Sequence, residues 1–441
     1  MAFVPADGSD IGGVVMAVLI VAGAYLVARL FVDRLHRRFL IVSGLEYVVL
    51  GLLLGPLSPR LHLAENMTFA MPFIALTAGW VGLLRGTTMT ARELSSLPLG
   101  TGRIVIWHHL VPGLLVGLVA AYFLTHITHW SWHFGSIPES GGWRQVAISA
   151  AVLGCCAAAD STEPFDLIVK RYRVVGPTAP NLRRAAHLGD VLVILVFGVL
   201  FCVYHHAEPG AALTLTPTEW AVVSVVLGGV LGALFTPFVG GEGSSNSRFL
   251  ALVGIISFAS GAAYFLDISP LLVNLALGVV LVRTSHKNRR LRETLADTEP
   301  PMRIVLLVIA GVLLEPVPWL PTLVLFLGFV ALRLVGKFVA SRIISLGTPL
   351  RPDLYRGLLA HGEVTIAMAV SFRVVWHGPI ADMAYAVVLA SVVVHDLIAP
   401  RVLRQLLRDL GELTEDRDAE VVEAPDPDAP DPADAPFEEP T

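Results

Sequence analysis

Long apolar runs recur along almost the whole chain, and each is close to the length that a helix needs to cross a bilayer. Of the 441 residues, 55% are hydrophobic and 15% are charged, whereas about a quarter of the residues of a soluble protein are charged. The runs do not alternate apolar and polar residues, as the strands of a membrane barrel do. The sequence therefore predicts an all-α, polytopic membrane protein.

We predict about 13 transmembrane helices from these runs. Their approximate limits are 11–33, 39–57, 68–86, 104–126, 144–173, 179–206, 218–240, 247–266, 270–285, 302–318, 321–346, 354–377 and 383–400. The fifth span is too long for one simple helix and contains Pro164, whereas the ninth and tenth are short. Between these two short spans, the segment Asp297–Pro301 is expected to be a linker and a candidate hinge between two halves.

Basic residues are concentrated in every second loop, for example Arg85, Arg92 and Arg103 after the third span. The intervening loops are nearly free of lysine and arginine. By the positive-inside rule, the N-terminus is outside and the C-terminus is in the cytoplasm, in a cell inner (plasma) membrane. This interpretation treats Arg85 as a cation of a cytoplasmic loop.

The C-terminal segment 411–441 differs sharply from the rest of the chain. It contains 12 acidic residues and one arginine, a net charge of −11, while the whole chain has a net charge of −5. Its Asp-Pro repeats cannot form a buried core. We therefore predict a transmembrane domain over residues 1–410 and an acidic, disordered cytoplasmic tail over residues 411–441.

Polar islands interrupt three of the apolar runs. They are Asp160–Pro164, Asp190 and His361–Glu363, and Lys337 adds a cation within a fourth run. A carboxylate at this depth must face a cavity, a partner or an ion, because hydrocarbon cannot solvate it. The islands are therefore the candidate functional residues.

Two of the islands predict interrupted helices. The span 144–173 is expected to break around Ala159–Pro164, because proline removes a backbone donor and clashes with the preceding turn. The span 354–377 is expected to break around His361–Glu363. Discontinuous helices expose carbonyls and half-helix ends that suit cation coordination. The breaks lie at corresponding places in spans 4–6 and 11–13, which are an odd number of spans apart, so the sequence predicts inverted repeats.

The acidic residues are spaced so that they can share one site. Asp160 and Asp190 are 30 residues apart, so a half-helix, a short loop and a returning half-helix bring them to similar depth. Glu163 lies about one helical turn from Asp160. With Ser161 and Thr162, these residues offer oxygen ligands for a small, hard, monovalent cation.

Several stretches together resemble the monovalent cation:proton antiporter superfamily, especially its bacterial sodium/proton and potassium/proton exchangers, over about residues 10–405. Glu46–Pro56 is similar to the family's early glycine-rich helix, and Ser269–Gly278 matches a recurrent family stretch. Thr162-Glu163-Pro164 resembles the Thr-Asp-Pro of the first broken helix, and Gly189-Asp190 resembles the Asp-Asp, Asn-Asp or Gln-Asp pair of the ion-binding helix. Lys337 lies where the family has a basic residue, and Gly362-Glu363 resembles the Arg-Gly-Glu of the second broken helix, with His361 in place of arginine. The resemblance implies the sodium/proton antiporter fold, in which two broken helices cross within a core domain beside a dimerisation domain.

The resemblance also implies a function: exchange of sodium, lithium or potassium for protons by alternating access, in a homodimer that serves pH homeostasis. Asp190 would bind the cation and the proton in competition. The other residues implied are Asp160, Ser161, Thr162 and Glu163 for binding, and Lys337, Glu363 and His361 for charge compensation at the crossing. Because Gly189 replaces the first acidic residue of the pair, we expect electroneutral exchange. Lys337 then lacks its usual partner, and Asp160 and Glu163 are the candidates.

The expected mechanism follows from competition between a proton and a monovalent cation for Asp190. Desolvation makes Asp190 hold its proton near neutral pH, and an entering cation displaces that proton. A loaded core crosses the barrier, whereas an empty, charged core does not, because moving a bare charge through low dielectric costs several kcal/mol. No cofactor, no nucleic-acid partner and no metal other than the transported cation are expected.

Structural roles remain open for each of these residues. Asp190 can bridge two helices, Asp160 and Glu163 can cap half-helices, and Lys337 and Glu363 can stabilise the crossing. Three further residues or pairs are expected to be structural: His108-His109 by packing, and Arg333 and Arg373 by extending to the membrane interface.

Other classes of protein are less consistent with the sequence. An organic-anion carrier with similar crossed helices would use Gln, Asn and Ser rather than acidic residues. An enzyme is not expected, because no HExxH, Gly-x-Ser-x-Gly or phosphate-loop motif occurs. A non-exchanging membrane sensor or scaffold remains an alternative, because Gly189 and His361 depart from the family pattern.

Overall fold

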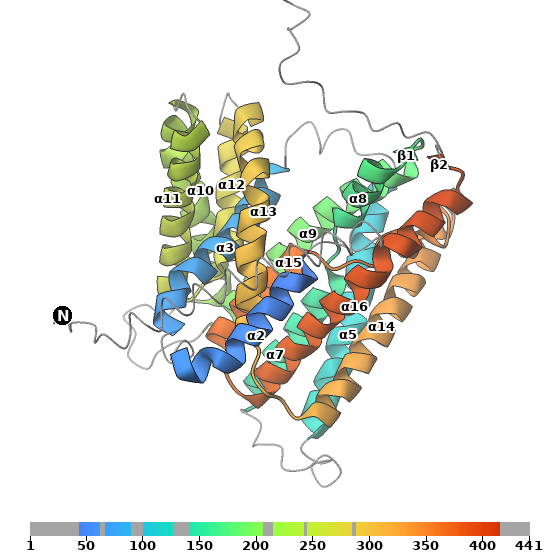
Figure 1. The fold of residues 1–441 in the computed structure, drawn as a ribbon, viewed down its shortest axis with the longest axis horizontal. Helices are drawn as coiled ribbons and strands as arrows, with labels where there is room; N and C mark the ends of the chain where they lie inside the picture. Colours follow the sequence, from blue (N-terminus) through green and yellow to red (C-terminus); the bar gives the residue numbers. More distant parts are fainter. Residues whose placement is uncertain are drawn as a thin grey trace, which may run out of the picture.

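The computed structural model describes residues 44–61, 67–89, 100–127, 142–205, 215–241, 245–284 and 288–414. In these ranges nearly all regular structure is α-helical (Figure 1). Seven helices there are long and apolar enough to cross a membrane, and two shorter apolar helices accompany them. The predicted class, a multi-pass helical membrane protein, is confirmed. The count of 13 stays a prediction, because the first predicted span, 11–33, lies outside the described residues.

Each helix overlaps a predicted span, although α13 begins well before its predicted span of 302–318. They are α2 (Leu45–Leu61), α3 (Met67–Thr87), α5 (Thr101–His126), α7 (Gly142–Ala158), α8 (Glu163–Arg171), α9 (Thr178–Val203), α10 (Pro217–Gly241), α11 (Ser245–Phe265), α12 (Pro270–Thr284), α13 (Asn288–Val312), α14 (Trp319–Ser345), a 3-10 turn (Leu354–Gly357), α15 (Glu363–Val375) and α16 (Pro379–Asp409). Two short strands, β1 (Arg173–Val174) and β2 (Leu413–Thr414), pair antiparallel.

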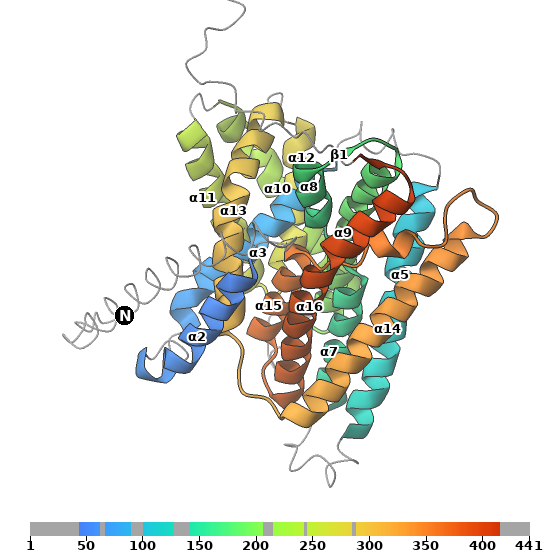
Figure 2. The same cartoon turned by 45° about the vertical axis from the view of Figure 1, so that its right-hand side comes forward.

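The helices form two groups that lie side by side (Figures 1 and 2). We call α2, α3 and α10–α13 the scaffold, and α5, α7, α8, α9 and α14–α16 the core. Glycines allow the scaffold backbones to approach closely. A Cβ built at Gly82 of α3 would lie 2.4 Å from the Leu271 carbonyl oxygen of α12, and one at Gly86 would lie 2.3 Å from that of Leu275. The backbone of α3 is therefore fixed to α12.

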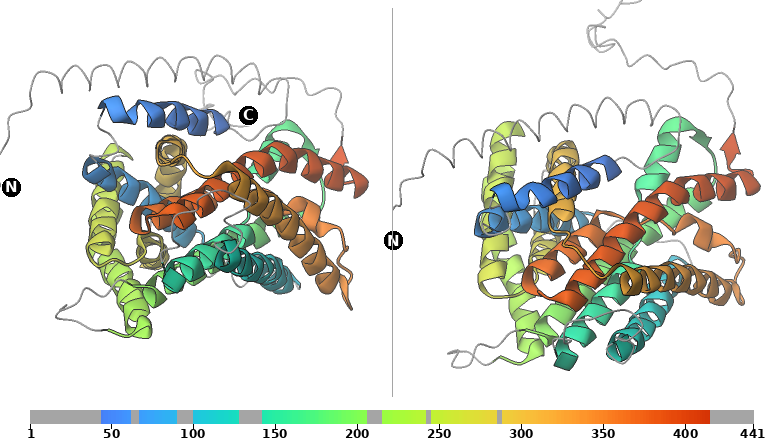
Figure 3. Two further views of the ribbon diagram at one scale, coloured as in Figure 1. Left: turned by 90° about the horizontal axis from the view of Figure 1, so that it is seen from below. Right: turned by 60° about the horizontal axis from the view of Figure 1, so that its bottom comes forward.

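The core contains two interrupted helices that cross. α7 and α8 are separated by the non-helical residues 159–162, and the 3-10 turn and α15 by residues 358–362. The breaks touch: a Cβ at Gly362 would lie 3.0 Å from the Asp160 carbonyl oxygen. The order α5, α7–α8, α9 is repeated by α14, the 3-10 turn with α15, and α16. The predicted crossing of two broken helices is confirmed, and Figure 3 shows the same arrangement of helices from two further directions.

The segment Asp297–Pro301 is not a linker, and that prediction is wrong. It lies inside α13, which continues from Asn288 to Val312 through Pro300 and Pro301. Leu291 and Leu295 are buried at helical spacing against the scaffold. Burial of this face outweighs the two backbone donors that the prolines lack.

The chain just after α16 packs back on the core. The Glu412 carboxylate accepts hydrogen bonds from the backbone amides of Thr178 (3.1 Å) and Ala179 (3.4 Å), which are free donors at the start of α9. β2 then pairs with β1. Residues 411–414 are thus joined to the core, and the rest of the predicted tail lies outside the described residues.

Candidate ion site at the helix crossing

The first break presents Asp160 at the centre of the core. The Asp160 side chain is completely buried, and Ser161 and Thr162 are buried beside it. Pro164 lies in the first turn of α8, where a missing amide donor costs nothing. The Ser161 hydroxyl accepts a hydrogen bond from the Glu163 amide at 3.2 Å. The proline therefore restarts the helix, and residues 159–162 before it stay non-helical around Asp160.

Lys337 of α14 neutralises Asp160. Its ammonium donates to Asp160 Oδ1 at 2.6 Å and to the Ala158 carbonyl at 3.2 Å, and it is fully buried. Of the two candidate partners that the sequence left open, Asp160 is the one that Lys337 contacts. The ion pair joins α14 of the second repeat to the break of the first.

Arg333, one turn before Lys337, holds both breaks together. Its guanidinium donates to four backbone carbonyls: those of Ala157 (3.0 Å), Ala159 (2.9 Å), Leu359 (2.5 Å) and Ala360 (3.3 Å). The residue is fully buried, so the prediction that it extends to the membrane interface is wrong. A planar fork of donors can satisfy carbonyls that an interrupted helix leaves unpaired.

Asp190 of α9 lies beside the crossing and is completely buried. Arg85 Nε approaches Asp190 Oδ2 at 3.1 Å, and Arg85 Nη2 approaches Glu363 Oε1 at 2.9 Å. Asp190 is therefore enclosed by protein rather than exposed to lipid, and Arg85 links it to Glu363 at the second break. Asp190 Oδ1 has no hydrogen-bond partner among the described residues. A buried, incompletely paired carboxylate of this kind suits a proton or a monovalent cation.

The sequence pattern predicts Arg85 as a cation of a basic loop, and this prediction is wrong. Arg85 lies in the last turn of α3 and is 5% exposed. The available signal was its position directly after the apolar run that ends at Leu84, within reach of one more helical turn. A loop residue and a helix-end residue look the same in this pattern, because the partners of Arg85 are distant in sequence.

Glu163 is at the edge of the site. It pairs with Arg303 of α13, and about a fifth of its side chain is exposed. The structure therefore brings together Asp160, Asp190 and Glu363 and places Glu163 between the core and the scaffold. Arg303 is a second basic residue of this boundary that the sequence analysis did not single out.

His109 of α5 occupies the space next to Gly189. A Cβ at Gly189 would lie 1.8 Å from His109 Nε2, and this nitrogen is 3.4 Å from Asp160 Oδ2. The absence of a side chain at position 189 thus has a steric cause. The neighbouring His108 packs by a 3.0 Å contact between its Nε2 and the Ser341 hydroxyl.

His361 lies in the second break, but its ring contacts hydroxyls rather than an acid. Nδ1 is 3.3 Å from the Thr365 hydroxyl and Nε2 is 3.2 Å from the Ser391 hydroxyl. Its backbone amide donates to Asp396 Oδ1 at 3.2 Å. The cation that contacts the carbonyls of the second break is Arg333, which donates to those of Leu359 and Ala360 just before His361.

Arg373, at the far end of α15, is also buried rather than extended to the interface. It pairs with Glu315 at 2.6 Å and with Asp382 at 2.8 Å. These contacts tie the end of the second broken helix to its neighbours.

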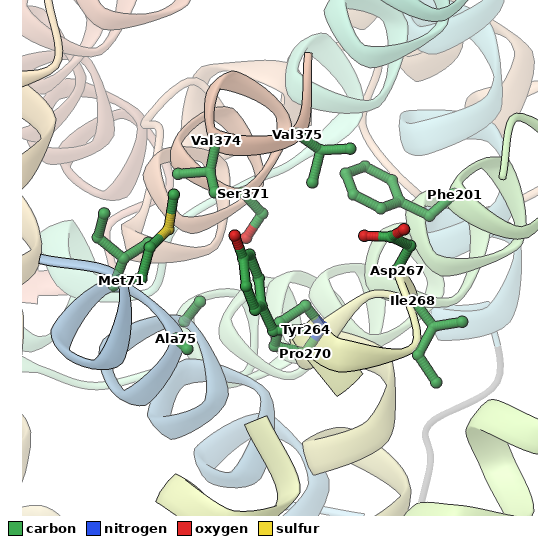
Figure 4. A pocket seen from close by; sticks show the side chains of 12 residues that line it. Met71, Ala75, Phe201, Tyr264, Asp267, Ile268, Pro270, Ser371, Val374 and Val375 are labelled. Atoms are coloured by element: carbon green, nitrogen blue, oxygen red, sulfur yellow. The ribbon is translucent and has the colours of Figure 1, made fainter. Parts of the chain in front are cut away.

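A narrow crevice separates scaffold and core at this end of α15 (Figure 4). Met71 and Tyr264 line it from the scaffold, and Phe201 and Ser371 line it from the core. Its water-accessible volume is about 30 Å³, enough for roughly one or two water molecules. Ser371 is eight residues along α15 from Glu363, about 12 Å at the helical rise.

The fold with this crossing is that of known sodium/proton antiporters. A structure of the sodium proton antiporter MjNhaP1 from Methanocaldococcus jannaschii at pH 8 superposes with a TM-score of 0.60 at 13% identity, covering 89% of this chain and 99% of that chain. A structure of MjNhaP1 from an electron microscopy map gives a TM-score of 0.58 at 16% identity and covers 91% and 99%. No family model and no curated protein matches the sequence. The predicted sodium/proton antiporter fold is confirmed.

Proposed function

We propose that this protein is a secondary active antiporter of the monovalent cation:proton antiporter superfamily, exchanging sodium, lithium or potassium for protons. The observation that carries the proposal is the position of Asp190, which is fully buried in this fold and shares Arg85 with Glu363 of the second helix break. Such a carboxylate can be neutralised by a proton or by a cation, but not by both together.

Exchange follows from this competition within an alternating-access cycle. The core moves against the scaffold when Asp190 is loaded, and the crevice of Figure 4 widens as the outer access path. Asp160, Ser161 and Thr162 supply further oxygens, and Lys337, Glu363 and His361 support the crossing. Glu163 belongs to the wider acidic set at its edge.

Charge balance at the crossing favours electroneutral exchange. Among the ion pairs of the crossing, three buried acids, Asp160, Asp190 and Glu363, pair with three bases, Arg85, Arg333 and Lys337. One proton leaving for each cation entering preserves this balance. We further propose a homodimer in a cell inner membrane, with its basic loops and acidic tail in the cytoplasm.

The same balance also favours a second candidate, a non-exchanging membrane sensor or scaffold. In this alternative the ion pairs of Asp160 and Asp190 are permanent and only hold helices together. Reconstituted transport separates the two functions, because a permanent pair cannot couple a cation gradient to proton movement.

The test is dissipation of an imposed pH gradient in proteoliposomes on adding sodium, lithium or potassium. At least one cation should collapse the gradient with the unmodified protein and with Asp166→Asn, which removes a half-exposed carboxylate of α8 that pairs with Arg183. Asp190→Asn should abolish the response. Absence of any response with folded, unmodified protein would favour the sensor or scaffold.

A further inference from the structure

Arg85 joins the two groups of helices through the candidate ion site itself. Its backbone belongs to the scaffold, on α3, whereas its two partners, Asp190 and Glu363, belong to the core, on α9 and α15. Gly82 and Gly86 pack α3 against carbonyls of α12, as described above. The guanidinium therefore cannot follow the core if the core slides along the scaffold.

We propose that Arg85 is a tethered counter-cation, which competes with the transported cation for Asp190 and holds the unloaded core against the scaffold. This inference rests on the proposed function and deepens it. It identifies a scaffold residue that sets the apparent cation affinity and prevents the unloaded core from moving across the membrane.

The energetic reason is the cost of separating a buried ion pair. Moving the core away from Arg85 while Asp190 is ionised leaves both groups charged, desolvated and unpaired, which is strongly unfavourable. A proton or cation on Asp190 cancels its charge and removes most of this attraction. Only the pair with Glu363 then still ties Arg85 to the core, so moving the core costs less when Asp190 is loaded, and loading is coupled to movement through Arg85.

Glu363 keeps the Arg85 guanidinium paired when Asp190 carries a proton or a cation. When Asp190 is neutralised, Arg85 keeps its contact with Glu363 at 2.9 Å. Further acids act on the guanidinium from neighbouring elements: Glu163 from α8 and Glu299 from α13. Arg85 therefore loses one of its two core partners on loading and retains the other, so the loaded state has a weaker tie to the scaffold without an unpaired guanidinium.

The affinity test measures binding of sodium, lithium and potassium to the purified variants at alkaline pH, and binding is detected as a shift in the thermal unfolding temperature. Arg85→Gln should lower the half-saturating concentration at least about tenfold, whereas Arg85→Lys, which keeps the charge, should stay near the unmodified protein. Arg248→Gln is the matched control, because Arg248 is a similarly buried scaffold arginine that donates to Thr294 of the scaffold. Equal or weaker binding by Arg85→Gln would overturn the competition.

A second test measures whether Arg85 fixes the position of the core relative to the scaffold, without any transport. Spin labels are placed at Phe265 of the scaffold and Trp143 of the core, two strongly exposed positions, and their distance distribution is recorded without alkali cation at alkaline pH. The unmodified protein and Arg248→Gln should give one dominant distance. Arg85→Gln, or Arg85→Gln/Glu363→Gln if the single variant does not fold, should give a broadened or second distance.

The two tests separate failure of this inference from failure of the proposed function. If no variant binds or exchanges a cation, the antiporter proposal fails, while the spin-label distances still report whether Arg85 fixes the core. A distribution in the Arg85 variants that superposes on that of the unmodified protein would overturn the tether.

Discussion

Arg333 offers the sharpest test of how the crossing is held together. It donates to two carbonyls of the first break, Ala157 and Ala159, and to two of the second, Leu359 and Ala360. Arg333→Lys keeps the charge but replaces a planar fork by a single ammonium, which cannot reach both breaks. At least two of the four hydrogen bonds should be lost.

The magnitude follows from the energy of charge-assisted hydrogen bonds. Each contributes about 1.5–3 kcal/mol, so the loss of two should lower the free energy of unfolding by about 3–6 kcal/mol. At roughly 2 °C per kcal/mol for a large domain, this corresponds to a fall in Tm of about 6–12 °C.

Three native cysteines make the assay simple. Cys155, Cys156 and Cys202 are all buried, so a thiol-reactive fluorophore added during heating reports unfolding without any introduced label. Arg342→Lys, an exposed position on the same helix where the guanidinium lies over the Phe338 ring, should change stability by no more than about 0.5 kcal/mol. Equal Tm values for Arg333→Lys and Arg342→Lys would refute the role of Arg333.

Three further substitutions test neighbouring contacts. Gly189→Asp should lower the Tm, because its Cβ would overlap the His109 ring. Adding His109→Ala should reverse much of this decrease in Tm, and an unchanged decrease would contradict the steric explanation. Lys337→Met should destabilise by about 3–5 kcal/mol by removing the 2.6 Å ion-pair partner of the buried Asp160 carboxylate. Asp160→Asn in the same chain should recover part of this loss, as a double-mutant cycle of unfolding free energies measures, and additive effects would exclude the pairing. Glu412→Ala should cost about 1 kcal/mol by removing the acceptor at the start of α9, and unchanged thermal unfolding would show that this contact is dispensable.

The helices and their two breaks could be predicted because their causes are local in sequence. Pro164 cannot donate within a helix, and polar residues at Asp160 and Glu363 cannot face hydrocarbon. α13 was misjudged because Pro300 and Pro301 suggested a boundary, whereas burial of a face that includes Leu295 favours a continuous helix.

The partners within the site could not be predicted in the same way. Arg85 and Arg333 each end or interrupt an apolar run, and such arginines usually lie in loops or extend to the interface. Only the three-dimensional approach of α3 to α9, and of α14 to both breaks, shows that these two cations are buried. The packing of His109 against Gly189 likewise depends on helices that are distant in sequence.

Sodium-, lithium- or potassium-driven proton movement in proteoliposomes containing Asp190→Asn is the most direct test of the central claim. The account predicts that the unmodified protein collapses a pH gradient with at least one of these cations and that Asp190→Asn does not. A cation-driven pH change that persists in the folded Asp190→Asn variant would contradict the account.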